Sequence, residues 1–365
     1  MSIELIISLV KANIVLAVLL TNTILLIWFE RKVVAGMQSR VGPDRAGPFG
    51  ILQTLADAIK LLLKEQILPS KADRAMYLLA PLIALVPSFL IFMIIPLGPD
   101  ITVEWQNALY TIPLVGADLN VGVLYFLALS SIAVYSVVLA GWSSGSKYPL
   151  LGGVRASAQM ISYEAAMGLA LVPVILYSGS LSLVDIVNSQ SGNLSTSIPI
   201  LNTIVSFIPK WNIFPQFVAF GIFFIAAVAE VNRAPFDLVE AEQELVGGFH
   251  TEYSGFRFAM FFLAEYINMF NMCAITATFF LGGWLGPTFE GILPPIFSVI
   301  MPIIWLGVKT FLLLFVFVWI RATLPRLRYD QLMELGWKRM IPISLVWLIL
   351  SAIVLGLREF GLPWS

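Results

Sequence analysis

MYLLAPLIALVPSFLIFMIIPL, from Met76 to Leu97, is a run of 22 residues without a charged side chain. A helix rising about 1.5 Å per residue needs about 20 mostly apolar residues to cross the hydrocarbon core of a bilayer. The two internal prolines, Pro81 and Pro87, are tolerated in bundled membrane helices. The stretch therefore predicts a helix that spans a membrane.

Seven further segments share this apolar character, although the fifth and eighth spans are shorter than the others. The expected spans are Leu9–Phe29, Met76–Leu97, Val121–Trp142, Ala156–Tyr177, Phe214–Ala229, Phe256–Leu281, Pro302–Ile320 and Ile341–Leu357. Of the 365 residues 59% are hydrophobic and only 12% are charged, about half the charge of a soluble domain. We expect an all-α fold, a polytopic membrane helix bundle with about eight transmembrane helices, as one integral membrane domain over residues 1–365.

Composition also excludes several kinds of chemistry within this chain. The net charge of −1 argues against nucleic acid as a partner. A single cysteine, Cys273, and a single histidine, His250, exclude a disulfide framework, an iron–sulfur cluster and a Cys/His zinc site. No nucleotide-binding glycine motif is present. Redox or nucleotide chemistry would belong to other chains, and we expect Cys273 and His250 to be structural or surface residues.

Basic residues alternate sharply between the loops. The first loop has eight, the third and fifth have two each and the seventh has five, whereas Lys210 is the one basic residue of the even loops. Because basic residues gather in cytoplasmic loops, the odd loops are expected to be cytoplasmic and both termini external. The loop at Gly98–Asn120 would then be external and the loop at Arg31–Arg74 cytoplasmic.

The first loop combines a turn-rich segment with an amphipathic helix. Glycines and prolines crowd Gly42–Gly50, which indicates a fixed path with tight turns. Ile51–Glu65 then reads as a helix whose Gln53, Asp57, Lys60 and Lys64 share one face. Such a helix lies at the membrane surface. It is either an interfacial anchor or the wall of a pocket for an amphipathic ligand.

The fifth loop is unusually acidic for a loop expected to be cytoplasmic. Its carboxylates are Glu230, Asp237, Glu240, Glu242, Glu244 and Glu252. On a helix, Asp237, Glu240 and Glu244 would share one face. Carboxylates that lie so near to one another raise each other's pKa. The loop is either a solvated acidic segment or a row of groups that hold and pass protons.

Acidic residues also occur in or at the ends of spans, where each is a candidate functional group. They are Glu30, Glu164, Glu230 and Glu265, all in the expected cytoplasmic half. They are either a relay beneath the acidic loop or structural acids bonded to serine and tyrosine hydroxyls. Lys309 enters its span from the external side, so we do not expect it to pair with Glu265. The arginines of the seventh loop, Arg326 among them, either bind lipid phosphates or dock an acidic subunit.

Several of these motifs together resemble the H-subunit family of proton-translocating NADH–quinone oxidoreductase, respiratory complex I, whose mitochondrial counterpart is NADH dehydrogenase subunit 1. The resemblance covers nearly the whole chain. The motifs that carry it are Glu30–Lys32, Arg40–Pro43 with Gly47–Gly50, Leu55–Asp57, Gly145–Tyr148 with Ile161–Glu164, Ala229–Val246, Thr251–Ser254 and Leu324–Gln331.

The resemblance implies a membrane-arm component that helps form a quinone chamber and couples quinone reduction to proton translocation. The chamber residues that it implies are Arg40, Phe49, Gln53, Asp57, Phe236, Asp237 and Arg326. The acid path that it implies is Glu30, Glu164, Glu230, Glu240, Glu242, Glu244, Glu252 and Glu265. One departure matters: some relatives carry a carboxylate in the third span where this chain has Ser131. Asp44, often asparagine in relatives, is a lesser one.

The resemblance further implies a substrate, partners and a location. Ubiquinone or menaquinone would be the substrate, with FMN and Fe–S clusters only in partner subunits. The partners would be hydrophilic-arm Fe–S and quinone-site subunits, small membrane subunits, antiporter-like subunits and membrane lipid. The expected location is the bacterial plasma membrane rather than the mitochondrial inner membrane. A related subunit of a membrane-bound hydrogenase and a standalone transporter are the alternatives; the absence of an evident internal repeat argues against the transporter.

Overall fold

The structure, a computed structural model, describes residues 3–105, 108–193, 209–237, 246–287 and 296–360. The helices of its bundle are α1 (Ile3–Met37), α3 (Arg74–Met93), α4 (Gly122–Ser143), α5 (Lys147–Ser178), α8 (Phe217–Glu230), α10 (Gly255–Phe280), α11 (Ile296–Thr323) and α13 (Ile341–Phe360). Its short elements are α2 (Gln53–Leu63), α6 (Leu183–Ser189), α12 (Tyr329–Glu334), the turns Pro48–Gly50 and Gly248–His250, and the strands β1 (Ile101–Trp105) and β2 (Ala108–Ile112). The predicted helical membrane bundle is confirmed.

Seven helices in the described part of the chain are long and apolar enough to cross a membrane, and the fifth expected span is a shorter helix. This helix, α8, has 14 residues and a length of about 21 Å, less than the roughly 30 Å of a hydrocarbon core. Most of its side chains are buried against the other helices, with Phe223, Ala226 and Ala227 fully enclosed. A helix enclosed by protein does not need to cross the full bilayer, because its backbone ends meet protein rather than lipid.

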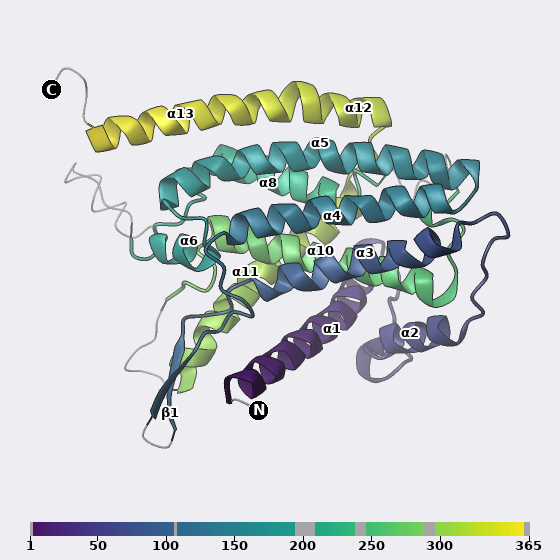
Figure 1. Cartoon of the computed structure of the whole chain (residues 1–365), viewed down its shortest axis with the longest axis horizontal. Coiled ribbons are helices and arrows are strands. Elements are labelled where there is room, and N and C mark those ends of the chain that lie inside the picture. The colour runs from purple at the N-terminus through teal and green to yellow at the C-terminus, as the bar shows by residue number, and fades with distance from the viewer. Residues whose placement is uncertain (1–2, 106–107, 194–208, 238–245, 288–295, 361–365) are drawn as a thin grey trace.

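Helices α3, α4 and α5 lie side by side, and α8 and α10 pack behind them, as Figure 1 shows. Small residues allow the close approaches: a side chain at Gly141 of α4 would collide with the Pro149 carbonyl oxygen of α5 at 2.5 Å. Two apolar clusters form the core. The smaller one, around Tyr77, Val137 and Met160, includes Phe249 and Tyr253 of the fifth loop.

The loops separate into two groups at opposite ends of the bundle (Figure 1). The N-terminal end of α1, the β1–β2 hairpin, α6 and the C-terminal end of α13 lie toward the left of the view, whereas α2 and α12 lie toward the right. This separation agrees with the alternation of the basic residues. The hairpin is antiparallel, with Ile101 opposite Ile112, and the sequence analysis did not predict it.

Two polar contacts satisfy backbone groups inside the bundle. Pro81 lacks the N–H that would bond the carbonyl of Tyr77, and the Tyr253 hydroxyl donates to this carbonyl at 3.2 Å. Lys309 of α11 donates through Nζ to the carbonyls of Leu281 and Gly283 at 2.6 and 2.9 Å, just beyond the end of α10. Lys309 therefore caps a helix end in the half of the molecule away from the acidic residues.

The C-terminal region is fixed against α5 immediately before Glu164. The hydroxyl of Tyr163 donates to the carbonyl of Leu332 in α12 at 2.9 Å. The indole of Trp337, in a π-helical turn over Leu335–Met340, donates to the Ser162 hydroxyl at 2.9 Å. These bonds fix the position of the α5 turn that carries Glu164.

Candidate functional site

A buried charge cluster forms where α1, the fifth loop, α10 and α11 meet. Arg233 lies at its centre: Nη1 is 3.0 Å from Oε1 of Glu30 and Nε is 2.7 Å from Oε1 of Glu265. Arg321 of α11 also pairs with Oε1 of Glu30. The guanidinium carbon of Arg233 lies 4.4 Å from the ring centroid of Tyr266. Two arginines and two glutamates therefore compensate one another within the protein.

Arg233 remains charged in this environment although it is buried. Burial lowers the pKa of Arg233, but the carboxylates of Glu265 and Glu30 outweigh it and raise the pKa well above its ordinary value. The group that bridges these carboxylates is thus a permanent cation, and neither neighbour loses its partner across the physiological pH range.

A second acidic pair lies beside this cluster and differs in its surroundings. Glu164 of α5 accepts a hydrogen bond from the hydroxyl of Ser130 at 3.1 Å and another from Ser131, both on α4. Glu230, at the end of α8, is buried, and its Oε2 has no hydrogen-bond partner among the described residues. Glu164 is the acidic group that acts electrostatically on Glu230.

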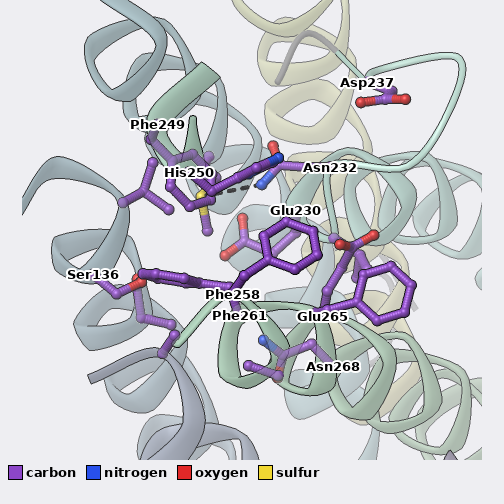
Figure 2. A pocket seen from close by; sticks show the side chains of 17 residues that line it. Ser136, Glu230, Asn232, Asp237, Phe249, His250, Phe258, Phe261, Glu265 and Asn268 are labelled. Atoms are coloured by element: carbon purple, nitrogen blue, oxygen red, sulfur yellow. Dashed lines mark hydrogen bonds between the residues drawn. The ribbon is translucent and has the colours of Figure 1, made fainter. Parts of the chain in front are cut away.

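A small cavity has one acid of each group, Glu230 and Glu265, in its wall (Figure 2). Figure 2 shows the carboxylates of Glu230 and Glu265 on neighbouring parts of its wall, with His250 above and Asn268 below. Aromatic side chains from the turn before α10 and from α10 itself form much of the remaining wall, namely Phe249, Phe258, Phe261 and Phe262. The cavity brings titratable groups from α8, the fifth loop and α10 around one partly open space.

Gln159 holds the segment that carries Glu230 and Arg233. This fully buried residue of α5 lies with its amide nitrogen 2.9 Å from the carbonyls of Ala229 and Phe236 and 3.1 Å from Oδ1 of Asn232. An amide N–H₂ group offers two hydrogens, and all three acceptors belong to the chain on either side of Arg233. One side chain therefore fixes the path of the fifth loop as it leaves α8.

An apolar cleft with a volume of about 390 Å³ lies between α1, α2, α3 and α10. Its walls are mostly aliphatic and aromatic, including Ile27, Leu85, Phe262 and Leu263. Its rim is polar: Nη1 of Arg31 on α1 lies 2.6 Å from Oδ2 of Asp57 on α2, and Gln53 donates to Asp57 at 3.2 Å.

The predicted amphipathic helix exists as α2, and its two faces have different surroundings. Gln53, Thr54 and Asp57 turn toward the bundle, whereas Leu55, Ile59, Leu62 and Leu63 are exposed. Burial opposes ionisation of Asp57, but hydrogen bonds from Arg31 and Gln53 and the charge of Arg31 outweigh it and lower the pKa of Asp57. The Arg31–Asp57 ion pair therefore holds α2 to α1 at neutral pH.

The other chamber residues that the sequence indicates are dispersed. Phe236 is buried against Tyr163, and Asp237 pairs with Arg326 at 3.3 Å between Nη2 and Oδ2. Arg40 is exposed and bonds Gln38, and Phe49 is exposed, with its carbonyl accepting the indole N–H of Trp28 at 2.9 Å. Neither Arg40 nor Phe49 lines the apolar cleft or the acidic cavity.

The structure places the sequence-predicted acids in three ways. Glu30 and Glu265 share the buried charge cluster, and Glu164 and Glu230 form the second pair. Glu252 is partly exposed, and its backbone carbonyl accepts a hydrogen bond from the hydroxyl of Tyr77 at 2.8 Å. Glu240, Glu242 and Glu244 lie outside the described residues.

The sequence analysis missed three contributors to this site: Arg321 as a partner of Glu30, Gln159 and Ser130. A buried polar residue within an apolar span was the available signal, because a polar group there needs a partner inside the protein. Gln159, four residues into its expected span, carried that signal. Arg321 did not, because an arginine at a membrane exit is an ordinary feature.

Comparison with known proteins gives consistent results over nearly the full length. The sequence profile of the family described as NADH dehydrogenase matches residues 10–352. The chain is 47% identical over 362 residues to an H subunit of the NADH-quinone oxidoreductase of Koribacter versatilis, covering 97% of this chain and 98% of the relative. It is 51% identical over 336 residues to an H subunit of the same enzyme from Syntrophobacter fumaroxidans, covering 92% of each. The corresponding H subunit of Frankia casuarinae is 52% identical over 346 residues, which cover 94% of this chain and 72% of the relative.

Proposed function

This chain belongs to the NADH dehydrogenase family as a subunit of the enzyme NADH-quinone oxidoreductase, and from that premise we propose that it helps form the quinone-binding chamber and couples quinone reduction to proton translocation. It is a multi-pass membrane protein within a multisubunit complex. The electrons come from the partner subunits, because a chain with one cysteine and one histidine has too few ligands for an Fe–S cluster.

The apolar cleft is the observation that carries the quinone assignment. A quinone has a polar head and a long apolar tail, and the cleft offers aliphatic and aromatic walls with a polar rim at Arg31 and Asp57. Its walls come from three membrane helices and from α2, the helix placed at the end of the bundle. A tail would lie between α1 and α10 while the head approaches the loops.

The acidic groups supply the proposed route for protons. Glu230 and Glu265 face one cavity, and Glu164 lies next to Glu230, so the described carboxylates form a short series from α5 through α8 to α10. Carboxylates relay protons because they exchange between two protonation states, and an amide of the same size does not. In the sequence, Glu230 is followed by the acidic stretch of the fifth loop, which holds Glu240, Glu242 and Glu244.

The same assignment implies a location and partners. We place the chain in a bacterial plasma membrane with both termini external, because the basic loops belong on the cytoplasmic side. Its partners are then hydrophilic-arm subunits with FMN and Fe–S clusters over the odd loops, and small and antiporter-like subunits within the membrane. The names of the relatives favour this assignment over a hydrogenase subunit or a standalone transporter.

Exchange of Glu230 for Gln tests the function. In the assembled complex, Glu230→Gln should preserve assembly and lower quinone reductase turnover and proton uptake by at least tenfold, because the pathway loses a titrating group. The measurements are quinone-linked activity and proton uptake in membrane vesicles, with assembly followed on native gels. Glu334→Gln, an exposed acid paired with Lys338 in its own helical region, is the matched control. Wild-type turnover and pumping in Glu230→Gln would contradict the relay.

A further inference from the structure

Lys309 is a buried basic residue within the membrane-spanning helix α11. Its side chain is about 6% exposed. Within the described residues its partners are three backbone carbonyls and one indole ring, and none of them is an acid. A charged side chain inside a membrane segment is costly and marks a candidate functional group. The surroundings of Lys309 therefore show how this chain accommodates a cation without a carboxylate.

The three carbonyls belong to the turn that follows α10. Nζ of Lys309 donates to the carbonyls of Leu281 at 2.6 Å and Gly283 at 2.9 Å, and also to that of Leu285. An ammonium group has three hydrogens, so each hydrogen has one acceptor. Nζ also lies 4.3 Å from the centroid of the Trp211 ring, whose face attracts a cation. We call these three carbonyls and this ring the carbonyl–indole cage.

Two successive glycines give the turn its shape. Gly282 and Gly283 have φ values of 72° and 50°, in the left-handed region that glycine adopts without a steric penalty. A side chain at Gly282 would also lie only 2.6 Å from Nε1 of Trp211, so this glycine allows the indole to pack on the turn. The pair of glycines therefore lets carbonyls of alternate residues converge on one atom beside the ring.

The turn is held by hydrogen bonds that do not involve the lysine. The N–H of Gly282 donates to Oε1 of the buried Gln190 at 3.0 Å. The N–H of Gly283 donates to the carbonyl of Ala277 at 2.9 Å, and the N–H of Leu285 donates to the carbonyl of Gly282 at 2.8 Å. These bonds remain when the ammonium group is removed. The cage is therefore preorganised, which lowers the cost of binding a cation in it.

We propose that the carbonyl–indole cage is a preformed binding site for a primary ammonium group, and that Lys309 is its resident ligand. The site recognises N–H donors through the carbonyls and positive charge through the ring. Its occupation ties α11 to the end of α10 and to Trp211, which precedes α8. The inference is independent of the quinone and proton roles, because the cage lies away from the acidic residues.

The half-life of thermal inactivation of the whole complex in detergent is the first test. Lys309→Met keeps most of the aliphatic side chain and removes the ammonium group. It should shorten the half-life by about tenfold or more, because three buried carbonyls lose a charged donor. Lys210→Met is the control, since this neighbouring lysine is exposed, and it should keep the wild-type half-life. Equal half-lives of the two variants would overturn the inference.

Added cations test whether the emptied cage binds a free ligand. Ammonium chloride should lengthen the half-life of Lys309→Met by about threefold or more, whereas tetramethylammonium chloride at the same concentration should not, because it has no N–H. Lys309→Ala should respond in the same way to n-propylammonium chloride, which also replaces the missing aliphatic chain. The wild type and Lys210→Met should not respond, because their cage is filled. Equal effects of ammonium and tetramethylammonium salts, or an equal response of the wild type, would overturn the proposal.

A substitution of the ring covers the case in which neither Lys309 variant assembles. Trp211→Leu and Trp211→Phe both leave the lysine in place, but only phenylalanine keeps an aromatic face. Trp211→Leu should therefore have a half-life several-fold shorter than that of Trp211→Phe. Equal half-lives of these two variants would show that the ring does not bind the ammonium group, and the proposed site would fail.

Discussion

At the scale of single residues, Arg233 combines burial with two ion pairs and an aromatic contact. It is buried, it contacts two glutamates from different helices, and it lies over the ring of Tyr266. A flat guanidinium serves several acceptors at once, which the single ammonium of lysine does not. Removing one member of a buried ion pair leaves the remaining charge without compensation, at a cost of roughly 3–5 kcal/mol.

We therefore expect Arg233→Met to destabilise the complex by about 3 kcal/mol, toward the lower end of that range because Glu30 retains Arg321. The measurements are the amount of assembled complex on native gels and the midpoint temperature of thermal inactivation. Arg328→Met is the matched control, since its ion pair with Asp330 is exposed and such pairs contribute little. An Arg233→Met complex as stable as the control would show that the cluster is not needed for the fold.

At the scale of elements, α2 is joined to the bundle through its polar face. An amphipathic helix at a membrane surface ordinarily turns its apolar face inward, toward the protein or the lipid. Here Asp57 and Gln53 face Arg31 of α1, and the exposed leucines of α2 remain for lipid or for a partner subunit. The helix thus forms one wall of the cleft, and the Arg31–Asp57 ion pair joins it to α1.

Asp57→Asn should raise the KM for quinone by up to about fivefold with a smaller change in kcat, because a partly exposed pair contributes roughly 0.2–1 kcal/mol. The pKa of Asp57 is lowered, so its contribution is complete above the ordinary aspartate pKa and is lost as the pH falls through the lowered value. The effect should be complete at neutral pH. Steady-state kinetics with a short-chain quinone measures it, with Glu65→Gln, just beyond the helix, as the control. An unchanged KM would show that the ion pair does not contribute to quinone binding.

At the scale of the whole molecule, the two groups of loops predict a fixed orientation in the membrane. Val41→Cys in the first loop and Asn120→Cys in the second should react with a membrane-impermeant thiol reagent from opposite sides. We expect labelling of Asn120→Cys in intact cells and of Val41→Cys only in inverted vesicles. The native Cys273 is fully buried, which keeps the background low. Labelling of both positions from the same side would contradict the topology.

Electron transfer should require the whole complex. The purified chain is expected to pass no electrons from NADH to quinone, because it has one cysteine and one histidine with which to hold a redox centre. Stopped-flow or steady-state reduction of a quinone by the purified chain in detergent measures this. The intact complex under the same conditions is the positive control. Turnover by the chain alone would place a redox site within it.

The sequence by itself determined the helical bundle and the order of its apolar segments, because hydropathy over about 20 residues is a local property that the bilayer selects directly. It did not distinguish the short α8 from the seven helices that are long enough to cross. It also located α2 through its helical periodicity, and it singled out the scarce acids of the spans, since a charge in an apolar segment is conspicuous. It missed the β1–β2 hairpin, although Ile101, Val103 and Trp105 alternate with two polar residues as in a strand, because five-residue strands are far shorter than the apolar runs that identify membrane spans.

Only the tertiary structure decided which groups meet. Arg233 and Arg321 lie 203 and 291 positions from Glu30 in the chain, and the packing of α1, α10 and α11 brings them together. The same holds for Ser131 and Glu164, which are 33 positions apart. Sequence spacing indicates neighbours only within one helix, through its 3.6-residue period. Between helices, the crossing angles and small residues at the contacts determine the pairs, and through them which acids have an arginine as partner.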